Sequence, residues 1–443
     1  MKVIQISLIG IIALMTMLWM SANTNALVNT HEIFAWRSLL LQYSGILALT
    51  VMSLGMLLTM RFSWLEDRLN GLDKVYRLHK WLGITALVFV LSHWLLFKVP
   101  RWLVEAGLLI KPARVARPPE SVEIFNFFQS QRGIAEEIGE YAFYLFVALI
   151  AIALIKRFPY RYFFMTHRWI ALVYLAVIVH AVVLMKYSYW TTILGLVLIP
   201  LMLLGIFATF TSMFKRIGQS RKVVGEVTAI SFLDGVNMTS TAIQLKSQWT
   251  GHYAGQFAFV TFDQHEGAHP FSITSAWLGD GKLTFLIKAL GDYTNTLNTS
   301  LKVGQSAVIE GPYGRFDFES KSQRQIWIAG GVGITPFIAR MKSLAIHPDG
   351  RLIDLFYSTT DVDHSALLLL EKDTKAAGVK LHLTINSRDG YLNGEMLRIK
   401  IPDWKGADIW FCGPAKFGQT MRSDLMLNGM VENHFHQELF EMR

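Results

Sequence analysis

Residues 78–94 read LHKWLGITALVFVLSHW and place two histidines, His79 and His93, near the two ends of one strongly apolar segment. A segment of this length and composition is typical of a helix that crosses a lipid bilayer. An ionisable side chain inside the hydrocarbon core costs free energy unless a partner compensates it, so such residues indicate function. Two histidines on one span therefore require an explanation that accounts for both.

More stretches in the first half of the chain reach membrane-spanning length, about 17–25 residues. The predicted spans cover residues 3–22, 36–60, 78–98, 139–156, 166–186 and 191–214. They explain a hydrophobic content of 52% in a chain of 443 residues. The second half has the composition of an ordinary globular protein. The sequence thus predicts a membrane half followed by a soluble half.

The first span has two interpretations. Lys2, an apolar run and SANTNA at 21–26 could form a secretory signal. The run extends over about 18 residues, however, which is longer than the usual signal core. We therefore expect an uncleaved helix.

The basic residues between the spans predict the orientation. If the N-terminus lies inside, the inner loops are 61–80, 156–168 and 215–222, and all three are rich in Lys and Arg. The outer segments 23–32 and 187–190 contain neither residue. This asymmetry predicts a multi-pass protein of the inner or plasma membrane whose soluble domains are cytoplasmic.

The net charge of +9 reports this orientation and does not indicate nucleic-acid binding, because the basic residues gather in the inner loops. The chain contains one cysteine, Cys412, which excludes an intrachain disulfide.

A second histidine pair, His167 and His180, lies on the fifth predicted span. The spacings of 14 and 13 residues correspond to roughly 21 and 20 Å along a helix. The third and fifth spans run in the same direction, so each of two levels offers two imidazoles. A haem held by two axial histidines in the core of a bundle requires this arrangement.

One detail of the helical geometry does not fit. Thirteen residues leave His180 about 140° away from His167 around a regular helix. Either the fifth span is locally distorted, or its two haems lie on different sides. Hydrogen-bonding histidines between helices are an alternative, whereas zinc is disfavoured because neither level adds Cys or carboxylate neighbours.

The soluble half changes its pattern near residue 325. Short β segments with Gly-rich turns come first, at 223–233, 240–247, 257–262, 282–290 and 306–314. They predict a small antiparallel barrel. Strands then alternate with helices, which predicts a parallel α/β sheet. The expected fold is an all-α six-helix transmembrane bundle, 1–220, followed by an antiparallel β-barrel domain, 221–320, and a parallel α/β nucleotide-binding domain, 321–443.

Three local motifs suggest nucleotide chemistry. IWIAGGVGITPF at 326–337 places a glycine turn before a helix start, where backbone N–H groups can approach a pyrophosphate. HPFSITS at 269–275 combines an aromatic ring with hydroxyls that can contact a flavin. LIKALGDYTNTL at 286–297 offers Lys288 and a turn that could hold phosphates. A plain strand-to-helix turn and a surface lysine are the alternative interpretations.

In this order, and together with the four histidines, these motifs resemble those of the NADPH oxidase and ferric reductase superfamily of transmembrane flavocytochromes. The resemblance extends from about residue 36 to the C-terminus. It implies two b-type haems whose iron is bound by His79, His93, His167 and His180. It also implies that FAD is contacted by His269, Pro270, Phe271, Ser272, Thr274, Ser275, Lys288, Gly291, Asp292, Thr294 and Phe440.

For NAD(P)H, the resemblance implicates a glycine-rich loop and a Cys-Gly-Pro element, which comprise Gly330, Gly331, Gly333, Thr335, Pro336, Cys412, Gly413 and Pro414. A 2′-phosphate requires a basic partner after the second strand of the nucleotide fold. YSTTDVD at 357–363 has no Arg, although Arg388 could take this place. NADH and NADPH both stay open as donors at this point.

The sequence departs from the family at several positions. Tyr293 stands where many relatives have Trp, and three residues follow Phe440. The outer segment 98–138 carries no motif of the family, and no EF-hand calcium loop precedes the membrane half.

The resemblance implies an oxidoreductase that passes electrons from cytoplasmic NAD(P)H through FAD and two b-type haems to an outer acceptor, dioxygen, giving superoxide. The expected partners are the donor, this acceptor and the bilayer, with no nucleic acid. A ferric-chelate reductase is an alternative, because Arg101, Lys111, Arg114 and Arg117 could attract an anionic chelate unless they pair with glutamates. A haem-flavin sensor or partner-dependent electron-relay subunit also stays open, as does a flavin reductase anchored by a haem-free bundle.

Overall fold

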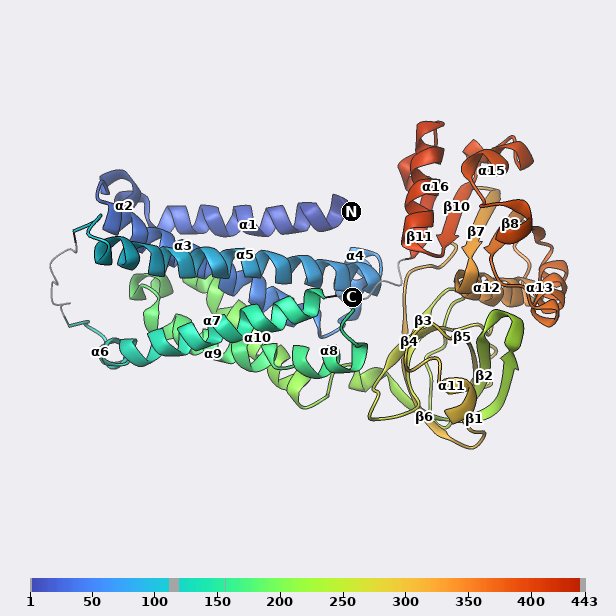
Figure 1. Ribbon diagram of the computed structural model, residues 1–443, viewed down its shortest axis with the longest axis horizontal. Coiled ribbons are helices and arrows are strands. Elements are labelled where there is room, and N and C mark those ends of the chain that lie inside the picture. The colour runs from blue at the N-terminus through green and yellow to red at the C-terminus, as the bar shows by residue number, and fades with distance from the viewer. Residues whose placement is uncertain (1, 111–118, 156, 439–443) are drawn as a thin grey trace. The chain divides into compact units, whose positions relative to one another are not determined.

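The computed structural model describes residues 2–110, 119–155 and 157–438. Its contacts divide the chain into two units. The membrane unit contains the residues up to Leu65 and Lys74–Ile217, and the soluble unit contains Glu66–Asp73 and the residues from Gly218 onward. Figure 1 labels the elements of both units.

The membrane unit is an all-α bundle. Its helices, with α4 at the junction, are α1 (Lys2–Ala22), α2 (Thr24–Asn29), α3 (Ile33–Leu58), α4 (Ser63–Leu69), α5 (Leu72–Glu105), α6 (Glu123–Ser130), α7 (Arg132–Leu154), α8 (Tyr160–His167), α9 (Ile170–Leu184) and α10 (Ile193–Met213). Among the described residues, six segments are long and apolar enough to cross a membrane. The predicted six-helix bundle is therefore confirmed.

The third and fourth spans are longer than the sequence predicted. α5 continues to Glu105 and α7 begins at Arg132, so part of the outer segment 98–138 extends the membrane helices. The short helix α6 lies between them in the sequence. Long apolar helices continue past the hydrocarbon boundary where polar residues no longer have to be buried.

α3 is the central helix of the bundle. It packs against α1, α9 and α10, and Ile46, Leu49 and Val51 are almost completely buried. Ser53 Oγ lies 2.8 Å from the hydroxyl of Tyr174 on α9. In lipid, polar side chains such as these are satisfied across helix interfaces, where they add to van der Waals packing.

Polar contacts tie α1 to the bundle. Thr16 Oγ1 lies 2.8 Å from the hydroxyl of Tyr43 on α3. The buried Asn23 accepts hydrogen bonds at Oδ1 from the Tyr189 hydroxyl, at 2.8 Å, and from Lys186 Nζ, at 3.3 Å. That α1 is an uncleaved helix stays a prediction.

The fifth span is broken next to its first histidine. α8 ends at His167 and α9 begins at Ile170, with Arg168 and Trp169 forming a turn. His167 and His180 therefore do not share one regular helix, and their 13-residue spacing does not fix the angle between them. Of the two explanations that the spacing allowed, the structure has the local distortion.

The first part of the soluble unit is a six-stranded antiparallel sheet. Its strands are β1 (Lys222–Leu233), β2 (Met238–Leu245), β3 (Phe257–Thr261), β4 (His269–Ser272), β5 (Lys282–Lys288) and β6 (Ser306–Tyr313), in the order β4-β3-β6-β1-β2-β5. Ile273 pairs with Phe285 of β5, which brings the two edge strands together. The sheet thus closes into the small barrel that the sequence predicted, around buried residues such as Val227, Ile243 and Ile309.

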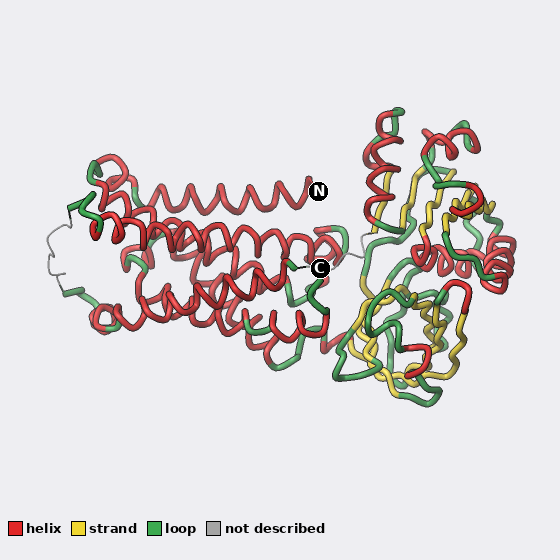
Figure 2. The backbone as a smooth tube through the Cα atoms, in the orientation of Figure 1, coloured by secondary structure: helices red, strands yellow, loops and turns green. Residues whose placement is uncertain are grey.

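The second part is a parallel sheet covered by helices (Figure 2). Its strands are β7 (Arg324–Gly330), β8 (Leu352–Thr359), β9 (Lys380–Ile385), β10 (Asp408–Cys412) and β11 (Phe435–Glu438), and its longer helices are α12 (Thr335–Ile346), α13 (His364–Ala377), α15 (Gly394–Lys400) and α16 (Ala415–Leu427). The order is β11-β10-β7-β8-β9. The order in which strands are added to the sheet reverses between β7 and β10. Folds of this kind bind dinucleotides at this point.

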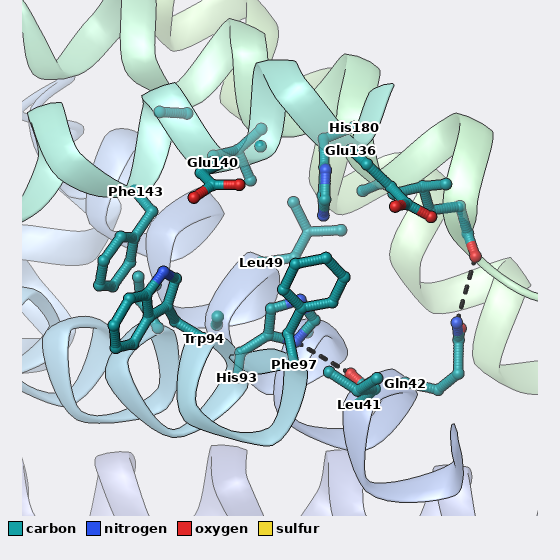
Figure 3. A pocket seen from close by; sticks show the side chains of 18 of the residues that line it. Leu41, Gln42, Leu49, His93, Trp94, Phe97, Glu136, Glu140, Phe143 and His180 are labelled. Atoms are coloured by element: carbon teal, nitrogen blue, oxygen red, sulfur yellow. Dashed lines mark hydrogen bonds between the residues drawn. The ribbon is translucent and has the colours of Figure 1, made fainter. Parts of the chain in front are cut away.

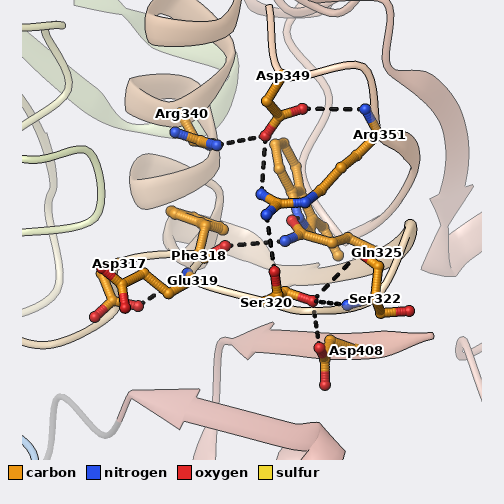
Figure 4. A network of polar contacts seen from close by, with 11 residues as sticks. Asp317, Phe318, Glu319, Ser320, Ser322, Gln325, Arg340, Asp349, Arg351 and Asp408 are labelled. Carbon is orange, nitrogen blue, oxygen red and sulfur yellow. Dashed lines mark hydrogen bonds and ion pairs between the residues drawn. The ribbon is translucent and has the colours of Figure 1, made fainter.

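A polar network holds the segment between the two sheets (Figure 4). Arg351 donates to the backbone oxygen of Ser320 at 2.8 Å and to Asp349 at 3.0 Å, and Arg340 donates to Asp349 at 2.7 Å. Ser320 Oγ also contacts Asp408. The network lies at the amino ends of the parallel strands, away from the ligand-binding edge, so its role is structural.

The Asn23 contacts give a test of how α1 is held. Replacing Asn23 by Ala leaves the buried Tyr189 hydroxyl without its acceptor, which costs about 1–3 kcal/mol of stability. We expect a lower midpoint of thermal unfolding in detergent for Asn23→Ala. Asn25→Ala is the matched control, because Asn25 is exposed. Equal midpoints for the two variants would contradict this description of the interface.

Candidate functional site

The four predicted histidines meet in two pairs inside the bundle. The ring centroids of His79 and His167 lie 6.0 Å apart, with 74° between the ring planes. Those of His93 and His180 lie 6.1 Å apart, with 79° between the planes. α5 contributes one ring to each pair, and the broken fifth span contributes the other.

The separations fit a metal ion shared by two imidazoles. With metal–nitrogen bonds of about 2.0 Å and a ring centre about 1.2 Å beyond each nitrogen, two imidazoles on opposite sides of a metal ion place their centroids about 6.4 Å apart. Both separations lie close to this value. Edge-to-face ring pairs have similar separations, about 4.5–7 Å. The residues present at each level thus fit a metal ion shared by two imidazoles.

Hydrogen bonds to backbone carbonyls orient three of the rings. Nδ1 of His79 lies 2.9 Å from the oxygen of Gly55, and Nδ1 of His93 lies 3.1 Å from that of Leu41. Nδ1 of His180 lies 2.8 Å from the oxygen of Ala135. A carbonyl can only accept, so each Nδ1 carries the proton and each Nε2 keeps the lone pair that a metal requires.

His167 is held differently. Its ring stacks on Phe163 at a centroid distance of 5.0 Å. Within the part of the chain that the structure describes, its buried Nδ1 has no hydrogen-bond partner. No group of three or more His, Cys, Asp or Glu side chains is placed to hold a metal among these residues either. The pairs are thus the candidate ligands.

A cavity of about 330 Å³ opens beside His93 and His180 (Figure 3). Ligand pockets in proteins have volumes of roughly 300–1,000 Å³. Trp94 and Phe143 stack in its wall at 4.9 Å between ring centroids. The remaining apolar lining includes Leu41, Ile46, Leu49, Met52, Val90, Phe97, Phe146, Val177 and Leu184. This shape and lining suit a flat, largely apolar cofactor.

The cavity rim carries paired charges. Lys98 lies 2.6 Å from Glu140, and Arg101 lies 3.7 Å from Glu136. Of the basic residues considered for a chelate-attracting surface, Arg101 is thus paired with a glutamate, as the alternative expected. The remaining basic residues considered for that surface, Lys111, Arg114 and Arg117, lie outside the described residues.

Glycines allow α3 and α7 to approach the rings of His93 and His180, which we call the outer rings. A Cβ atom at Gly139 on α7 would lie 2.1 Å from Nδ1 of His180, and one at Gly45 on α3 would lie 3.3 Å from Cε1 of His93. Neither glycine was predicted to belong to the site. The signal that could have found them is a glycine inside an apolar span, because small residues mark close helix contacts in membranes.

The predicted flavin motif forms β4, which pairs with β3 in the barrel. The ring of His269 stacks on Tyr293 at 4.6 Å between centroids. Burial lowers the pKa of His269 and raises the pKa of Tyr293 to about 12, so both are uncharged at neutral pH. Pro270 and Phe271 continue the strand and are partly buried. The motif thus presents a neutral, aromatic surface.

The hydroxyls of this region are integrated into the barrel. Ser272 is buried, and Thr274 Oγ1 lies 3.0 Å from Thr284 Oγ1. Ser275 Oγ accepts a hydrogen bond from the backbone N–H of Thr284 at 3.1 Å. Their contact with FAD stays a prediction.

The predicted phosphate turn follows β5. Thr294 Oγ1 accepts the N–H groups of Leu290 and Gly291, each at 3.0 Å, which closes the turn around the exposed Asp292. Lys288 Nζ lies 2.8 Å from Asp361 Oδ2 beyond β8, so this lysine also contacts the nucleotide sheet. Phe440, the predicted flavin cover, lies outside the described residues.

The glycine loop and the Cys-Gly-Pro element meet where the sheet order reverses. A Cβ at Gly333 would lie 2.2 Å from the backbone oxygen of Cys412, and one at Gly330 would lie 2.9 Å from Cδ of Pro414. Gly331 has a φ of +55°, which favours glycine. Only residues without a side chain allow the two loops to pack this closely.

The neighbouring predicted residues complete this edge. Thr335 and Pro336 form the first turn of α12, and Gly413 packs against Gly330. Burial raises the pKa of the Cys412 thiol, so it stays protonated at neutral pH. The edge therefore offers backbone N–H groups at a helix start and no anionic side chain from these residues, a suitable surface for a pyrophosphate.

Arg388, the predicted substitute partner of a 2′-phosphate, is exposed on the short helix α14 (Asn386–Asp389). Its Nε and Nη2 donate to the two carboxylate oxygens of Asp389 at 2.7 and 2.9 Å. This hydrogen bonding lowers the pKa of Asp389 to about 2. The guanidinium is thus occupied by an intrachain carboxylate.

Comparison with known families gives two matches. Residues 44–178 match the family described as ferric reductase like transmembrane component, and residues 226–317 match a family of FAD-binding domains. The first match includes His79, His93 and His167 and ends before His180. The second includes the whole of β4 and β5.

Curated relatives match part of the chain. A flavohemoprotein of Oceanobacillus iheyensis is 30% identical over 162 residues, which cover 34% of this chain and 40% of the relative. The glycine betaine monooxygenase reductase subunit of Chromohalobacter salexigens is 26% identical over 187 residues, which cover 39% and 48%. This chain thus spans less than half the length of each of these relatives.

Solved structures are similar at low identity. The FAD/NAD-binding domain of a nitric oxide dioxygenase from Vibrio cholerae is 21% identical, with a TM-score of 0.43, over 49% of this chain and 98% of that one. A flavohemoglobin from Malassezia yamatoensis is 16% identical, with a TM-score of 0.47, over 91% and 98%.

The glycine on α7 provides a prediction for the outer pair. Gly139→Ala places a methyl group where the His180 ring lies. With one haem expected at each histidine pair, the haem bound per polypeptide should fall by about half, because the pair of His79 and His167 is not affected. Gly133→Ala on the same helix is the control, because a Cβ there meets no atom within 4 Å. The pyridine haemochrome assay measures both variants. An unchanged haem content in Gly139→Ala would argue against His180 as a ligand.

Proposed function

Because the chain has the architecture of the NADPH oxidase and ferric reductase superfamily, we propose that it moves electrons across a membrane from NAD(P)H to an outer acceptor, using FAD and two b-type haems. The ferric reductase-like bundle and the FAD-binding domain make the chain a transmembrane oxidoreductase. The haems, the acceptor and the direction of transfer belong to the proposal.

The observation that carries the proposal is the pair of histidine levels. Each level has two imidazoles at a centroid separation that suits one shared iron, and three rings have Nδ1 engaged by a carbonyl. With Nδ1 engaged, Nε2 of each of these three rings keeps the lone pair that a metal requires. Two haem levels within a hydrocarbon core of about 30 Å would divide the path of the electron across the membrane into shorter steps.

The protein positions its cofactors and tunes them. FAD, when bound, accepts a hydride and releases single electrons, and haem carries one electron at a time. His93 and His180 would hold the haem at their level, and the haem would supply one-electron transfer to the acceptor.

The soluble unit would provide the electron donor site. The aromatic β4 surface with its neutral His269 suits an isoalloxazine ring, because an uncharged environment does not disturb the neutral forms of the flavin. The loop from Gly330 to Pro336 and the segment from Cys412 to Pro414 would hold NAD(P)H at the reversal of the sheet. The basic loops 61–80, 156–168 and 215–222 favour a cytoplasmic position of this unit, in the inner or plasma membrane.

Dioxygen, which would give superoxide, is the acceptor that the outer level favours. Arg101 pairs with Glu136 and Lys98 with Glu140, which offsets part of the positive charge that could attract an anionic ferric chelate, although Arg37 and Arg132 also line the cavity. The cavity wall beside His93 and His180 is mainly apolar, which suits a small neutral acceptor. A ferric-chelate reductase is the second candidate. A haem-flavin sensor or electron-relay subunit would differ by its lack of turnover without a partner.

Replacing His93 tests the route through the bundle. We expect His93→Leu to abolish reduction of acceptors on the outer side, by at least 100-fold, while NAD(P)H oxidation by a dye that takes electrons from the flavin changes less than twofold. His31→Leu is the control, because His31 is an exposed histidine between α2 and α3. If His93→Leu keeps full outer-side activity, the chain is an anchored flavin reductase.

A competition between acceptors tests the assignment of dioxygen. In nanodiscs with excess NAD(P)H, the rate in air should exceed the anaerobic rate with ferric citrate by at least tenfold. Superoxide dismutase should suppress the reduction of cytochrome c in the aerobic reaction. The opposite order of rates would instead identify a ferric-chelate reductase.

A further inference from the structure

We propose that the electron donor is NADH rather than NADPH, and that Asp361 determines this preference. The proposal rests on the proposed function, since it names the substrate of the same nucleotide site. It follows from where Asp361 lies in the sheet and from the side chains that surround it.

Asp361 lies where a nucleotide fold recognises the adenosine ribose. β7 is followed by the glycine loop, and β8 is the next strand in both sequence and space. In folds with this strand order, a residue after the second strand contacts the ribose: an acid hydrogen-bonds the 2′-hydroxyl of NADH, whereas an Arg accommodates the 2′-phosphate of NADPH. β8 ends at Thr359, and Asp361 follows two residues later.

The carboxylates near this position are not equivalent. Asp363 Oδ1 accepts the N–H of Ala366 at the start of α13, and its Oδ2 accepts the N–H of Gly235, both at 2.9 Å. Its carboxylate is thus used to cap the helix and to join the two sheets. The side chain of Asp361 is 44% exposed, which leaves carboxylate surface available to a ligand.

The nearby basic side chains are already paired. Lys288 Nζ lies 2.8 Å from Asp361, and both carboxylate oxygens of Asp389 hold the Arg388 guanidinium. Each of these two cations thus has its own carboxylate, and Asp363 adds a third carboxylate to the segment after β8. A 2′-phosphate would have to break an ion pair to gain a basic partner, whereas a ribose diol only needs an acceptor.

The other polar groups at this edge are uncharged. Ser358 Oγ lies 2.9 Å from Asn386 Oδ1, and Asn386 Nδ2 donates to Thr360 Oγ1 at 3.1 Å. A neutral residue, Thr360, thus occupies the position after β8 at which a basic residue could bind a phosphate. Hydroxyl and amide groups cannot neutralise a phosphate dianion, so they do not favour NADPH.

The first experiment compares the two donors on the purified full-length protein, with FAD and haem bound. The readout is kcat/KM for NADH and for NADPH, with a dye that accepts electrons from the flavin and with rates expressed per bound FAD. We expect NADH to be preferred by at least tenfold. A ratio near one, or a preference for NADPH, would overturn the assignment of NADH.

The second experiment uses the ion pair between Lys288 and Asp361. Asp361→Asn removes the negative charge and one of the two acceptor oxygens that the diol can use, and it releases the lysine, so kcat/KM should fall for NADH and rise for NADPH, changing their ratio at least tenfold. Adding Lys288→Met should cancel the gain for NADPH. Glu371→Gln, which removes one exposed negative charge on α13, is the control and should leave the ratio unchanged.

The outcomes separate this inference from the function on which it rests. If neither nucleotide reduces the flavin of the holoprotein, the proposed function fails. If both reduce it and Asp361→Asn leaves the ratio unchanged, only the role of Asp361 is overturned.

Discussion

The structure of the membrane unit depends on how the imidazole rings are oriented. The two rings of each pair lie edge-on to one another, at 6.0 and 6.1 Å between centroids. Carbonyl oxygens of Gly55, Leu41 and Ala135 hold three of them by Nδ1. The central helix α3 supplies two of these carbonyls, and most of its span is buried within the bundle. One set of hydrogen bonds thus fixes both the tautomer and the spacing.

In the soluble unit, close packing of two backbone segments shapes the predicted nucleotide edge. Gly330 and Gly333 bring the helix start of α12 against the Cys412–Pro414 segment, where any side chain would collide. On the predicted flavin surface of β4, burial keeps His269 and Tyr293 uncharged, and Asp263 and Glu266 act on Tyr293 in the same direction. At the end of β8, Lys288 and Asp361 form an ion pair. We propose that this charged position is where the two nucleotides are distinguished.

Much of this organisation could be predicted from the sequence, because its signals are local. Long apolar runs identified six spans, and the spacing of His79 and His93 predicted two levels. The 13-residue spacing of His167 and His180 indicated that the fifth span could be distorted, but it did not place the turn at Arg168 and Trp169. The approach of Gly139 to His180 and the pairing of Lys288 with Asp361 join residues distant in sequence. The sequence predicted spans shorter than α5 and α7, because hydropathy marks the hydrocarbon core and not the end of the helix.

The proposed electron route requires that each histidine pair holds one haem. The amount of haem b per polypeptide in the purified protein, measured by the pyridine haemochrome assay beside its FAD content, decides this point. We expect about two haems for each FAD. A value near zero in protein that retains FAD and has been supplied with haem would contradict the proposed route, and would leave the four histidines as structural residues of a membrane-anchored flavin reductase.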